Sequence, residues 1–420
     1  MAQSSPPVKL ACNMQDIIVV KPYQFVPPHK GRIWPWLIVH LLMQPYLRHY
    51  YGIRRFESRH GEKIRASLDA GHAIVLVANH TRPCDPIAAG WLTRLAKEPM
   101  YCMASWHVFM NSRIDRFISR RCGAYSVYRE GSDHTSLNFS INSLVHHDRP
   151  IILFAEGFVT RSNDLVRPLL DGAALIARTA ARRLAKADPP RKVVIHPVAF
   201  KYFFRGDLEA SVTPVLERLE KQLSLSPPDD LPLVERIRKI GRGLLRKREI
   251  EFLGEPQKSG ENDKGFHDRV ESLIEKILDP LERQYALGNN PHGVYARVQA
   301  LRSRIVPDLI GGQLSDKEEK LRWQHIRELY IAQDLGCYPR DYLADNPSTE
   351  RILETVERLE ENLTDRATIH KPLDGVIQVG DAIEVATKRE RRLAVDPLTT
   401  AVHTSISQMI QNICHHPPPT

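Results

Sequence analysis

The sequence has little of what marks several familiar protein classes. Its six cysteines are scattered over 420 residues and no two form a Cys-x-x-Cys pair, which argues against a disulfide framework and a cysteine-rich zinc site. A glycine-rich phosphate loop of the P-loop or dinucleotide type is missing, so a nucleotide-hydrolysing or redox role lacks support. No zinc finger, helix-turn-helix or RNA-binding aromatic signature is present either. Nucleic-acid binding is therefore a weak interpretation.

Long apolar runs are also missing. Residues 1–30 contain five prolines and no apolar core of the signal-peptide kind, and we expect this segment to be flexible. The one conspicuous apolar run, residues 33–47, falls short of the roughly 20 residues that span a bilayer, and two prolines interrupt it. The sequence therefore predicts a soluble or peripheral protein rather than a membrane-spanning one.

Two interpretations of this apolar run stay open. Arg32 and Arg48 flank it, and tryptophan and tyrosine side chains lie near its ends, as in segments that lie in the lipid headgroup region. The alternative is an amphipathic helix packed on the protein's own core. In the first case we expect a cytoplasmic protein in peripheral contact with the inner face of the membrane.

Basic residues outnumber acidic ones by 59 to 50. Such a balance attracts polyanions without saying whether these are lipids, nucleic acids or phosphorylated substrates. The basic amphipathic stretch at residues 236–248 fits either a solvated helix face or a contact with anionic headgroups.

From residue 57 to about 200, short apolar runs alternate with longer helical patterns, which is typical of an α/β domain. The apolar runs 73–78 and 151–154 predict strands buried on both faces. Long charged helical patterns dominate after residue 205. We therefore predict an α/β domain with a mixed, mostly parallel sheet at residues 31–205, a mainly helical extension at 206–413 and a disordered tail at 414–420.

The leading catalytic candidates are His80 and Asp85, which stand in a loop between a predicted buried strand and a helix. Loops of this kind carry function. A histidine can take a hydroxyl proton near neutral pH, and a nearby carboxylate can fix its tautomer and favour the imidazolium. The pair resembles a serine-hydrolase triad without its serine, so the substrate's own hydroxyl would attack. The alternative for Asp85 is a simple helix N-cap.

Four segments in order resemble the family of 1-acylglycerol-3-phosphate and glycerol-3-phosphate acyltransferases over residues 50–205. The first is similar to the family's Asn-His-x-Ser-x-x-Asp, and the third to its Phe-Pro-Glu-Gly-Thr-Arg-Ser. The four segments are Asn79-His80-Thr81-Arg82-Pro83-Cys84-Asp85, Gly123 to Arg129, Phe154-Ala155-Glu156-Gly157-Phe158-Val159-Thr160-Arg161-Ser162, and Val194-Ile195-His196-Pro197-Val198-Ala199.

The resemblance implies an enzyme that moves a fatty acyl group from acyl-CoA or acyl carrier protein to a hydroxyl of a glycerophospholipid-type acceptor. It makes His80 the general base and Asp85 its partner. The residues implied in binding the phosphorylated acceptor are Arg82, Arg129, Glu156, Gly157 and Arg161. No metal or bound cofactor is implied, because a thioester is already activated and the thiol carrier is a co-substrate.

The sequence departs from the family pattern at three places. Arg82 stands where the family has Ser, Ala155 replaces a Pro, and two residues are inserted before Thr160. The alternatives stay open that Arg129 is a solvated charge, that Glu156 only caps or pairs with a neighbour, and that Gly157 makes a turn. A catalytically silent lipid- or protein-binding relative and an acyl hydrolase also remain as rival functions.

Overall fold

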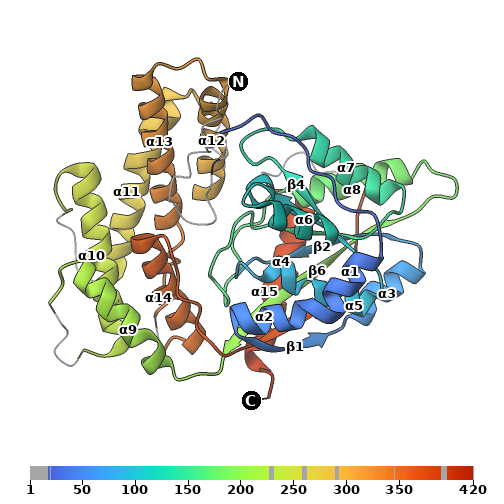
Figure 1. Cartoon of the computed structure of the whole chain (residues 1–420), viewed down its shortest axis with the longest axis horizontal. Helices are drawn as coiled ribbons and strands as arrows, with labels where there is room; N and C mark the ends of the chain where they lie inside the picture. The colour runs from blue at the N-terminus through green and yellow to red at the C-terminus, as the bar shows by residue number, and fades with distance from the viewer. Residues whose placement is uncertain are drawn as a thin grey trace. The chain divides into compact units, whose positions relative to one another are not determined.

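The computed structural model describes residues 18, 20–226, 231–257, 263–288, 293–344, 346–388 and 395–419. The chain divides into two compact units (Figure 1). What we call the α/β unit consists of Gln24–Tyr128, Asp133–Gly206 and Ile369–Thr420. The helical unit consists of the described part of Met1–Tyr23 together with Arg129–Ser132 and Asp207–Thr368.

One sheet organises the α/β unit, and within the described residues it has eight strands. Seven follow the order β1-β7-β6-β2-β5-β3-β4, and β8 pairs with β6. Their bounds are β1 Ile53–Arg59, β2 Ala73–Ala78, β3 Tyr101–Ser105, β4 Ala124–Val127, β5 Ile151–Phe154, β6 Val193–Phe204, β7 Leu373–Val379 and β8 Ile383–Glu384. All pairs are parallel except those of β6 with β7 and β8. The predicted class, a mixed and mostly parallel sheet flanked by helices, is confirmed.

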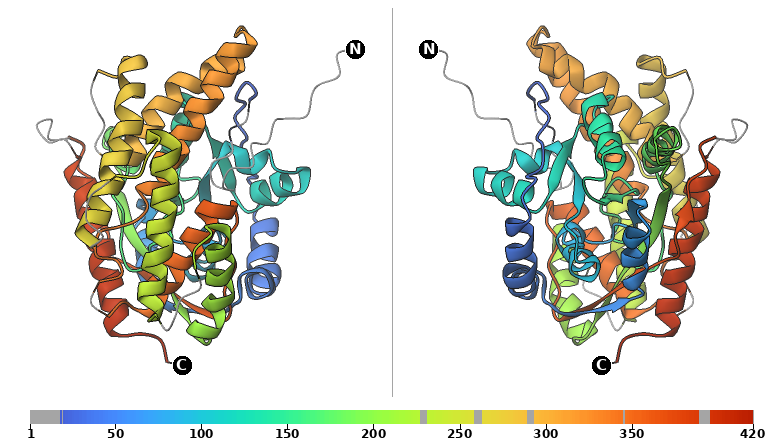
Figure 2. Two further views of the ribbon diagram at one scale, coloured as in Figure 1. Left: turned by 90° about the vertical axis from the view of Figure 1, so that its left-hand side faces the viewer. Right: turned by 90° about the vertical axis from the view of Figure 1, so that its right-hand side faces the viewer.

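Helices cover both faces of this sheet, and Figure 2 shows α15 on the opposite side from α1 and α2. The helices of this unit are α1 Ile33–Leu37, the π-helix η1 Ile38–Leu42, α2 Met43–Tyr51, α3 Glu62–Asp69, α4 Asp85–Ala88, α5 Gly90–Ala96, the 3₁₀-helix η2 Trp106–Phe109, α6 Arg113–Arg121, α7 His134–Val145, α8 Gly172–Leu184 and α15 Pro397–His415.

The central strand β2 shows why this sequence forms a covered sheet. All six of its residues are buried. Side chains alternate between the faces of a strand, and Ala73, Val75 and Val77 join the apolar core that α7, α8 and α15 close. Ile74 and Leu76 point to the other face and are equally buried. A continuous apolar run is the pattern expected of a strand covered on both sides.

The predicted boundary of the C-terminal extension at residue 413 is wrong. Residues 369–419 return to the α/β unit, where β7 lies between β1 and β6 and α15 packs on β6. Sequence patterns report local periodicity and do not reveal a strand that pairs with partners more than 150 residues away. The division near residue 205 agrees with the structure, since Gly206 ends the second segment of the α/β unit.

The predictions of a flexible N-terminus and a disordered tail are wrong for their described parts. Val26 is buried and its N–H donates to Ser126 Oγ at 2.8 Å. The carbonyl of His416 accepts a hydrogen bond from Arg59, and that of Pro418 accepts one from Arg205 at 2.8 Å. These backbone groups are held by partners distant in the sequence. The prediction for residues 1–17 lies outside the described residues.

Residues 57–59 end β1, and α3 begins only at Glu62. The strand lies at the edge of the sheet, so charged side chains on it reach solvent and hide the strand pattern. Arg54 and Arg55 both donate to the buried carboxylate of Asp374 in β7.

The helical unit is built around a second apolar core, which includes Leu273, Leu301 and Leu329. Its helices are α9 Leu208–Gln222, α10 Leu233–Leu253, α11 Asp263–Gln284, α12 Val294–Gly311, α13 Asp316–Leu335 and α14 Thr349–Thr364. Within it, Arg302 of α12 donates to the carboxylate of Glu130 at 2.5 Å, and both side chains are largely buried. This ion pair ties the short segment Arg129–Ser132 to the helical unit.

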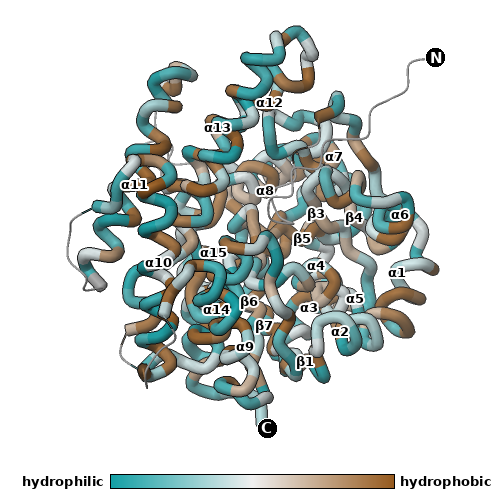
Figure 3. Tube along the Cα trace, turned by 60° about the vertical axis from the view of Figure 1, so that its left-hand side comes forward, coloured by the Kyte–Doolittle hydropathy of each residue, from teal (hydrophilic) through white to brown (hydrophobic). Residues whose placement is uncertain are grey.

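Among the described residues, no helix combines the length and apolar character needed to cross a bilayer. The apolar run at residues 33–47 forms α1, η1 and most of α2, and its apolar residues appear brown near the label α1 in Figure 3. It is partly packed, since Met43 and Leu47 are buried, and partly open, since Trp36 is 56% exposed and Leu41 55%.

Candidate active site

The candidate site lies at the carboxyl edge of two parallel strands, β2 and β5. Ala78, the last residue of β2, is the register partner of Phe154, the last residue of β5. His80 and Glu156 each follow two residues later. Because both strands run in the same direction, the chain leaves them at the same edge, and functional loops of α/β sheets meet at this edge.

His80 and Asp85 form the pair that the sequence predicts. His80 Nδ1 lies 3.0 Å from Asp85 Oδ2, and the histidine side chain is 14% exposed while the carboxylate is fully buried. The same carboxylate oxygen accepts hydrogen bonds from the backbone N–H groups of Thr81 and Arg82 at 2.7 and 2.8 Å. Because this oxygen accepts from its other neighbours and also faces Nδ1 of His80, the pairing favours a proton on Nδ1 and leaves Nε2 as the basic nitrogen.

Asp85 is therefore not a simple helix N-cap. It is the first residue of α4, and its carboxylate turns back to the loop before the helix instead of capping the N–H groups that follow. Its second oxygen, Oδ1, accepts a hydrogen bond of 2.5 Å from the hydroxyl of Tyr202 in β6. Burial and the neighbouring Asp85 carboxylate raise the pKa of Tyr202. The tyrosine is thus a neutral donor that holds Asp85 in place.

Two asparagines extend the sheet around this tyrosine. Strand β6 is paired with β2 only as far as Val198. Beyond that point the side-chain amide of Asn79 exchanges two hydrogen bonds with the backbone of Phe200, and Asn163 exchanges two with the backbone of Tyr202. Both amides are fully buried. They satisfy the strand's backbone groups and fix the position from which Tyr202 reaches Asp85.

Glu156 holds the backbone of His80. Its Oε2 accepts the N–H of His80 at 2.5 Å and its Oε1 accepts the N–H of Arg167 at 2.6 Å. Burial raises the pKa of this carboxyl to about 8, against the lowering effect of the two backbone donors. Through these contacts Glu156 acts as a positioning residue. Its contact with the acceptor stays a prediction. Thr160 also holds the backbone of His80, because both its N–H and its hydroxyl donate to the His80 carbonyl.

The segment after Glu156 brings Gly157 and Arg161 into this region. Gly157 has a φ of 82° and donates its N–H to the carbonyl of Phe154. It therefore makes a turn, which was the alternative to a role in binding the acceptor. Arg161 also adopts a left-handed backbone, with a φ of 46°, and its side chain is buried. Arg82 is buried as well, and its guanidinium carbon lies 5.6 Å from the ring centre of Tyr202. Two arginines thus belong to the segments that surround the His80–Asp85 pair.

Arg129 belongs to the helical unit, where its carbonyl accepts a hydrogen bond from Gln299. Its role in phosphate binding stays a prediction. Among the described residues, no three His, Cys, Asp or Glu side chains are grouped so as to hold a metal ion.

Cys84 lies inside the motif, but it is a poor nucleophile here. It is completely buried, its sulfur is 3.8 Å from the hydroxyl of Tyr202, and burial raises its pKa to about 12. Only a thiolate attacks a thioester efficiently. The geometry therefore favours direct attack by an acceptor hydroxyl over an acyl-cysteine intermediate.

Sequence reasoning missed Tyr202 and Asn163, and it gave no role to Thr160. For Tyr202 a signal existed, because a tyrosine inside a continuous apolar strand needs a hydrogen-bond partner for its hydroxyl. That signal names no partner. The fourth motif segment ends at Ala199, whereas β6 continues to Phe204 and so includes Tyr202.

Comparison with known proteins supports the same class. Residues 55–201 match the family model described as Acyltransferase. The resemblance seen in the four motif segments is confirmed over these residues, which make up about a third of the chain. The 1-acyl-sn-glycerol-3-phosphate acyltransferase of Streptococcus pneumoniae (strain ATCC BAA-255 / R6) is 28% identical over 193 residues, which are 45% of this chain and 64% of the relative. The chain thus matches less than two thirds of that relative's length. No solved structure matches the chain.

Proposed function

We propose that the protein is an O-acyltransferase that moves a fatty acyl group from acyl-CoA or acyl carrier protein to a hydroxyl of a glycerophospholipid-type acceptor. The observation that carries this proposal is the His80–Asp85 pair, which leaves Nε2 of a partly exposed imidazole as the basic nitrogen. The acyltransferase-family match over residues 55–201 supports it.

In the proposed reaction, Nε2 of His80 takes the proton of the acceptor hydroxyl while the oxygen attacks the thioester carbonyl. Asp85 favours the imidazolium that forms. The tetrahedral intermediate collapses as the carbon–sulfur bond breaks, and the imidazolium returns its proton to the leaving thiolate. Atoms and charge balance with no metal or bound cofactor, and the thiol carrier leaves as product.

We assign the phosphate of the acceptor to arginine side chains around this pair. Arg82 and Arg161, both in the α/β unit, are the candidates. A guanidinium binds two phosphate oxygens at once, which suits it to this task. The name of the Streptococcus pneumoniae relative specifies a phosphorylated acylglycerol as acceptor, and we extend that substrate class to this chain.

A membrane supplies such an acceptor, and one face of the α/β unit suits contact with it. Exposed apolar side chains gather on α1, η1, α2 and α6. They are Ile33, Trp36, Leu41, Leu42, Tyr46, Tyr50, Ile114, Phe117 and Ile118. The rings of Trp34 and Phe117 lie 5.7 Å apart, so α1 and α6 form one surface, and Arg121 stacks on both. We propose peripheral binding to the inner face of the cytoplasmic membrane through this surface.

A transfer assay tests the proposal. Radiolabelled acyl-CoA or acyl carrier protein is offered with glycerol 3-phosphate, lysophosphatidic acid, other lysolipids, or water alone. We expect transfer to one phosphorylated acceptor by the wild type, loss of transfer in His80→Ala, and unchanged transfer in the matched control His134→Ala, which alters an exposed histidine of α7. Equal background with every acceptor in wild type and His80→Ala would refute the enzyme. Release of label to water alone would favour a hydrolase.

The phosphate assignment has its own readout. Arg161→Ala should raise the acceptor KM for phosphorylated acceptors only. An unchanged KM would remove Arg161 from the phosphate site.

A further inference from the structure

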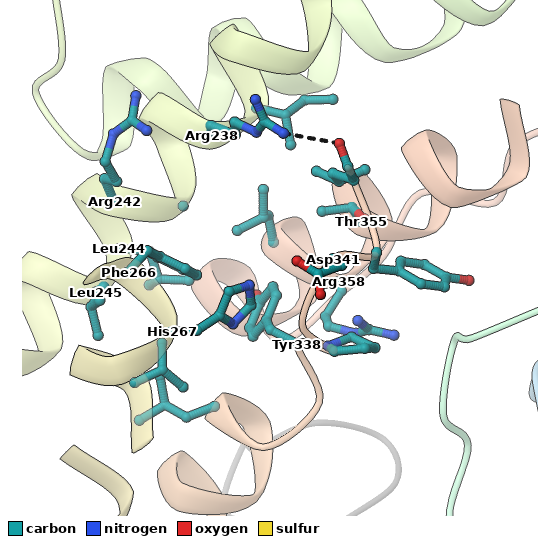
Figure 4. A pocket seen from close by; sticks show the side chains of 18 of the residues that line it. Arg238, Arg242, Leu244, Leu245, Phe266, His267, Tyr338, Asp341, Thr355 and Arg358 are labelled. Carbon is teal, nitrogen blue, oxygen red and sulfur yellow. Dashed lines mark hydrogen bonds between the residues drawn. The ribbon is translucent and has the colours of Figure 1, made fainter. Parts of the chain in front are cut away.

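The helical unit contains a pocket between α10, α11, α14 and the loop that follows α13, shown in Figure 4. Its cavity has a volume of about 90 Å³ and is partly open to solvent. Small-molecule sites are mostly apolar, with a few polar groups that fix orientation. Every residue that lines this pocket belongs to the helical unit, so it is built from residues other than those of the His80 site.

The walls of the pocket suit a hydrocarbon chain. Aliphatic and aromatic side chains make up most of the lining, among them Leu245, Phe266, Val270 and Leu359. Gly241 of α10 also lines it, and a Cβ added there would meet nothing closer than the Phe266 ring at 3.9 Å. A glycine inside a helix lowers helix stability relative to residues with a side chain. Here it leaves space along the wall that a larger residue would fill.

Charged groups at the pocket are mainly cationic. Arg238 and Arg242 project from α10 one turn apart along the same side of the pocket, and Arg358 lies across from them on α14 (Figure 4). Arg238 is engaged by Glu235 and by the carbonyl of Leu343. For Arg242 the structure gives no hydrogen bond or ion pair within the described part of the chain. Asp341 is the one acidic residue of the lining.

From this combination we infer that the helical unit binds a single-chain anionic amphiphile, with its chain against Gly241 and Phe266 and its acidic head near Arg242. A fatty acid carboxylate and the phosphate of a lysophospholipid share this chemistry. The negative charge of Asp341 repels an anionic head group. Removing this charge should therefore strengthen the binding of an acidic ligand. The inference does not depend on acyl transfer at His80.

The test is equilibrium binding to the full-length chain by displacement of fluorescent cis-parinaric acid, with oleate, 1-oleoyl-lysophosphatidic acid and the neutral oleyl alcohol as competitors. All proteins carry His80→Ala to prevent turnover. Saturated fatty acids of increasing length should bind roughly fourfold tighter for each added CH₂ until the pocket is filled. A preference for oleate identifies a carboxylate ligand and a preference for the lysolipid a phosphate ligand.

Variants decide whether this pocket is the binding site. Gly241→Leu should abolish the binding, and its thermal midpoint should not fall, because leucine is the better helix former. Arg242→Gln should weaken binding of both acidic competitors at least fivefold without changing that of oleyl alcohol, and Asp341→Asn should strengthen binding of the acidic competitors. Arg246→Gln, which removes the same charge from an exposed position of the same helix, is the matched control and should have no effect.

Unchanged binding in Gly241→Leu would overturn the site. Equal effects of Arg242→Gln and Arg246→Gln, or weaker acid binding in Asp341→Asn, would overturn the assignment of an anionic ligand. Absence of acyl transfer in the protein with His80 intact, with binding at this pocket retained, would count against the proposed enzyme and leave this site standing.

Discussion

Replacing Asp85 by asparagine removes the charge of this side chain and keeps its shape. The amide oxygen of asparagine can take the place of Oδ2 and accept from His80 Nδ1 and the two backbone N–H groups. Its NH₂ group then faces Tyr202, whose hydroxyl can rotate to accept instead of donating. We therefore expect Asp85→Asn to fold, to keep the imidazole in place and to keep its proton on Nδ1.

The substitution removes the negative charge that favours the imidazolium. The two groups approach to 3.0 Å, the carboxylate is fully buried and the imidazole is 14% exposed, so solvent screens them weakly. Unit charges about 4 Å apart at an effective dielectric constant of about 20 interact by about 4 kcal/mol. If the transition state carries most of that charge on His80, kcat should fall roughly 10³-fold.

The assay is acyl transfer at saturating acceptor, with kcat and KM measured separately and thermal unfolding as a check on folding. Asp69→Asn, an exposed change on α3, is the matched control and should behave like wild type. A folded Asp85→Asn enzyme whose kcat stays within about threefold of wild type would refute the view that Asp85 acts through its charge. It would then act only as a hydrogen-bond acceptor.

Three further variants test the surroundings of this pair. Tyr202→Phe removes a hydrogen bond to a buried carboxylate, so the free energy of unfolding should fall by about 1.5–3 kcal/mol in denaturant titrations; an unchanged value would mean that Tyr202 does not hold Asp85. Glu156→Gln tests the carboxyl whose pKa burial raises to about 8. With that pKa, the native state keeps a proton that the unfolded state releases above about pH 4.5. The free energy of unfolding of the wild type should therefore fall relative to that of the variant as the pH rises from 5 to 8, by at most about 1.4 kcal/mol per pH unit. A difference between the two proteins that is constant with pH would contradict the raised pKa. The double change Phe117→Ser and Ile118→Ser on α6 should weaken sedimentation with anionic vesicles at least tenfold, whereas Leu175→Ser, an equally exposed leucine of α8, should not; equal sedimentation of both variants would exclude α6 from the lipid surface.

Local patterns in the sequence predicted the parts of the fold that local interactions determine. Strands β2 and β5 lie at the residues expected from their apolar runs. The His80–Asp85 contact spans five residues within one loop, so its spacing is readable from the sequence. The run of charge in β1 hid a strand, because an edge strand exposes side chains that an inner strand buries.

What stayed hidden depends on contacts between residues far apart in the chain. Strand β7 pairs with β1 across more than 300 residues, and no pattern within residues 373–379 names that partner. The same holds for the hydrogen bonds that position the site, since Glu156 accepts from the His80 backbone and Tyr202 donates to Asp85. Residue types indicated that these groups need partners, but not which partners they find.

The orientation of the Asp85 carboxylate does not depend on the motif alone. The motif supplies the base and its carboxylate, but the direction in which the carboxylate points is set from outside it, by Tyr202 at the far end of β6. Tyr202 in turn depends on Asn163, which satisfies the strand's backbone where β2 no longer pairs with it. A change at Asn163 should therefore disturb Asp85 without touching any motif residue. Whether a chain with this His-x4-Asp spacing has an oriented base thus depends on how far β6 extends past its neighbour and on what pairs with the extension.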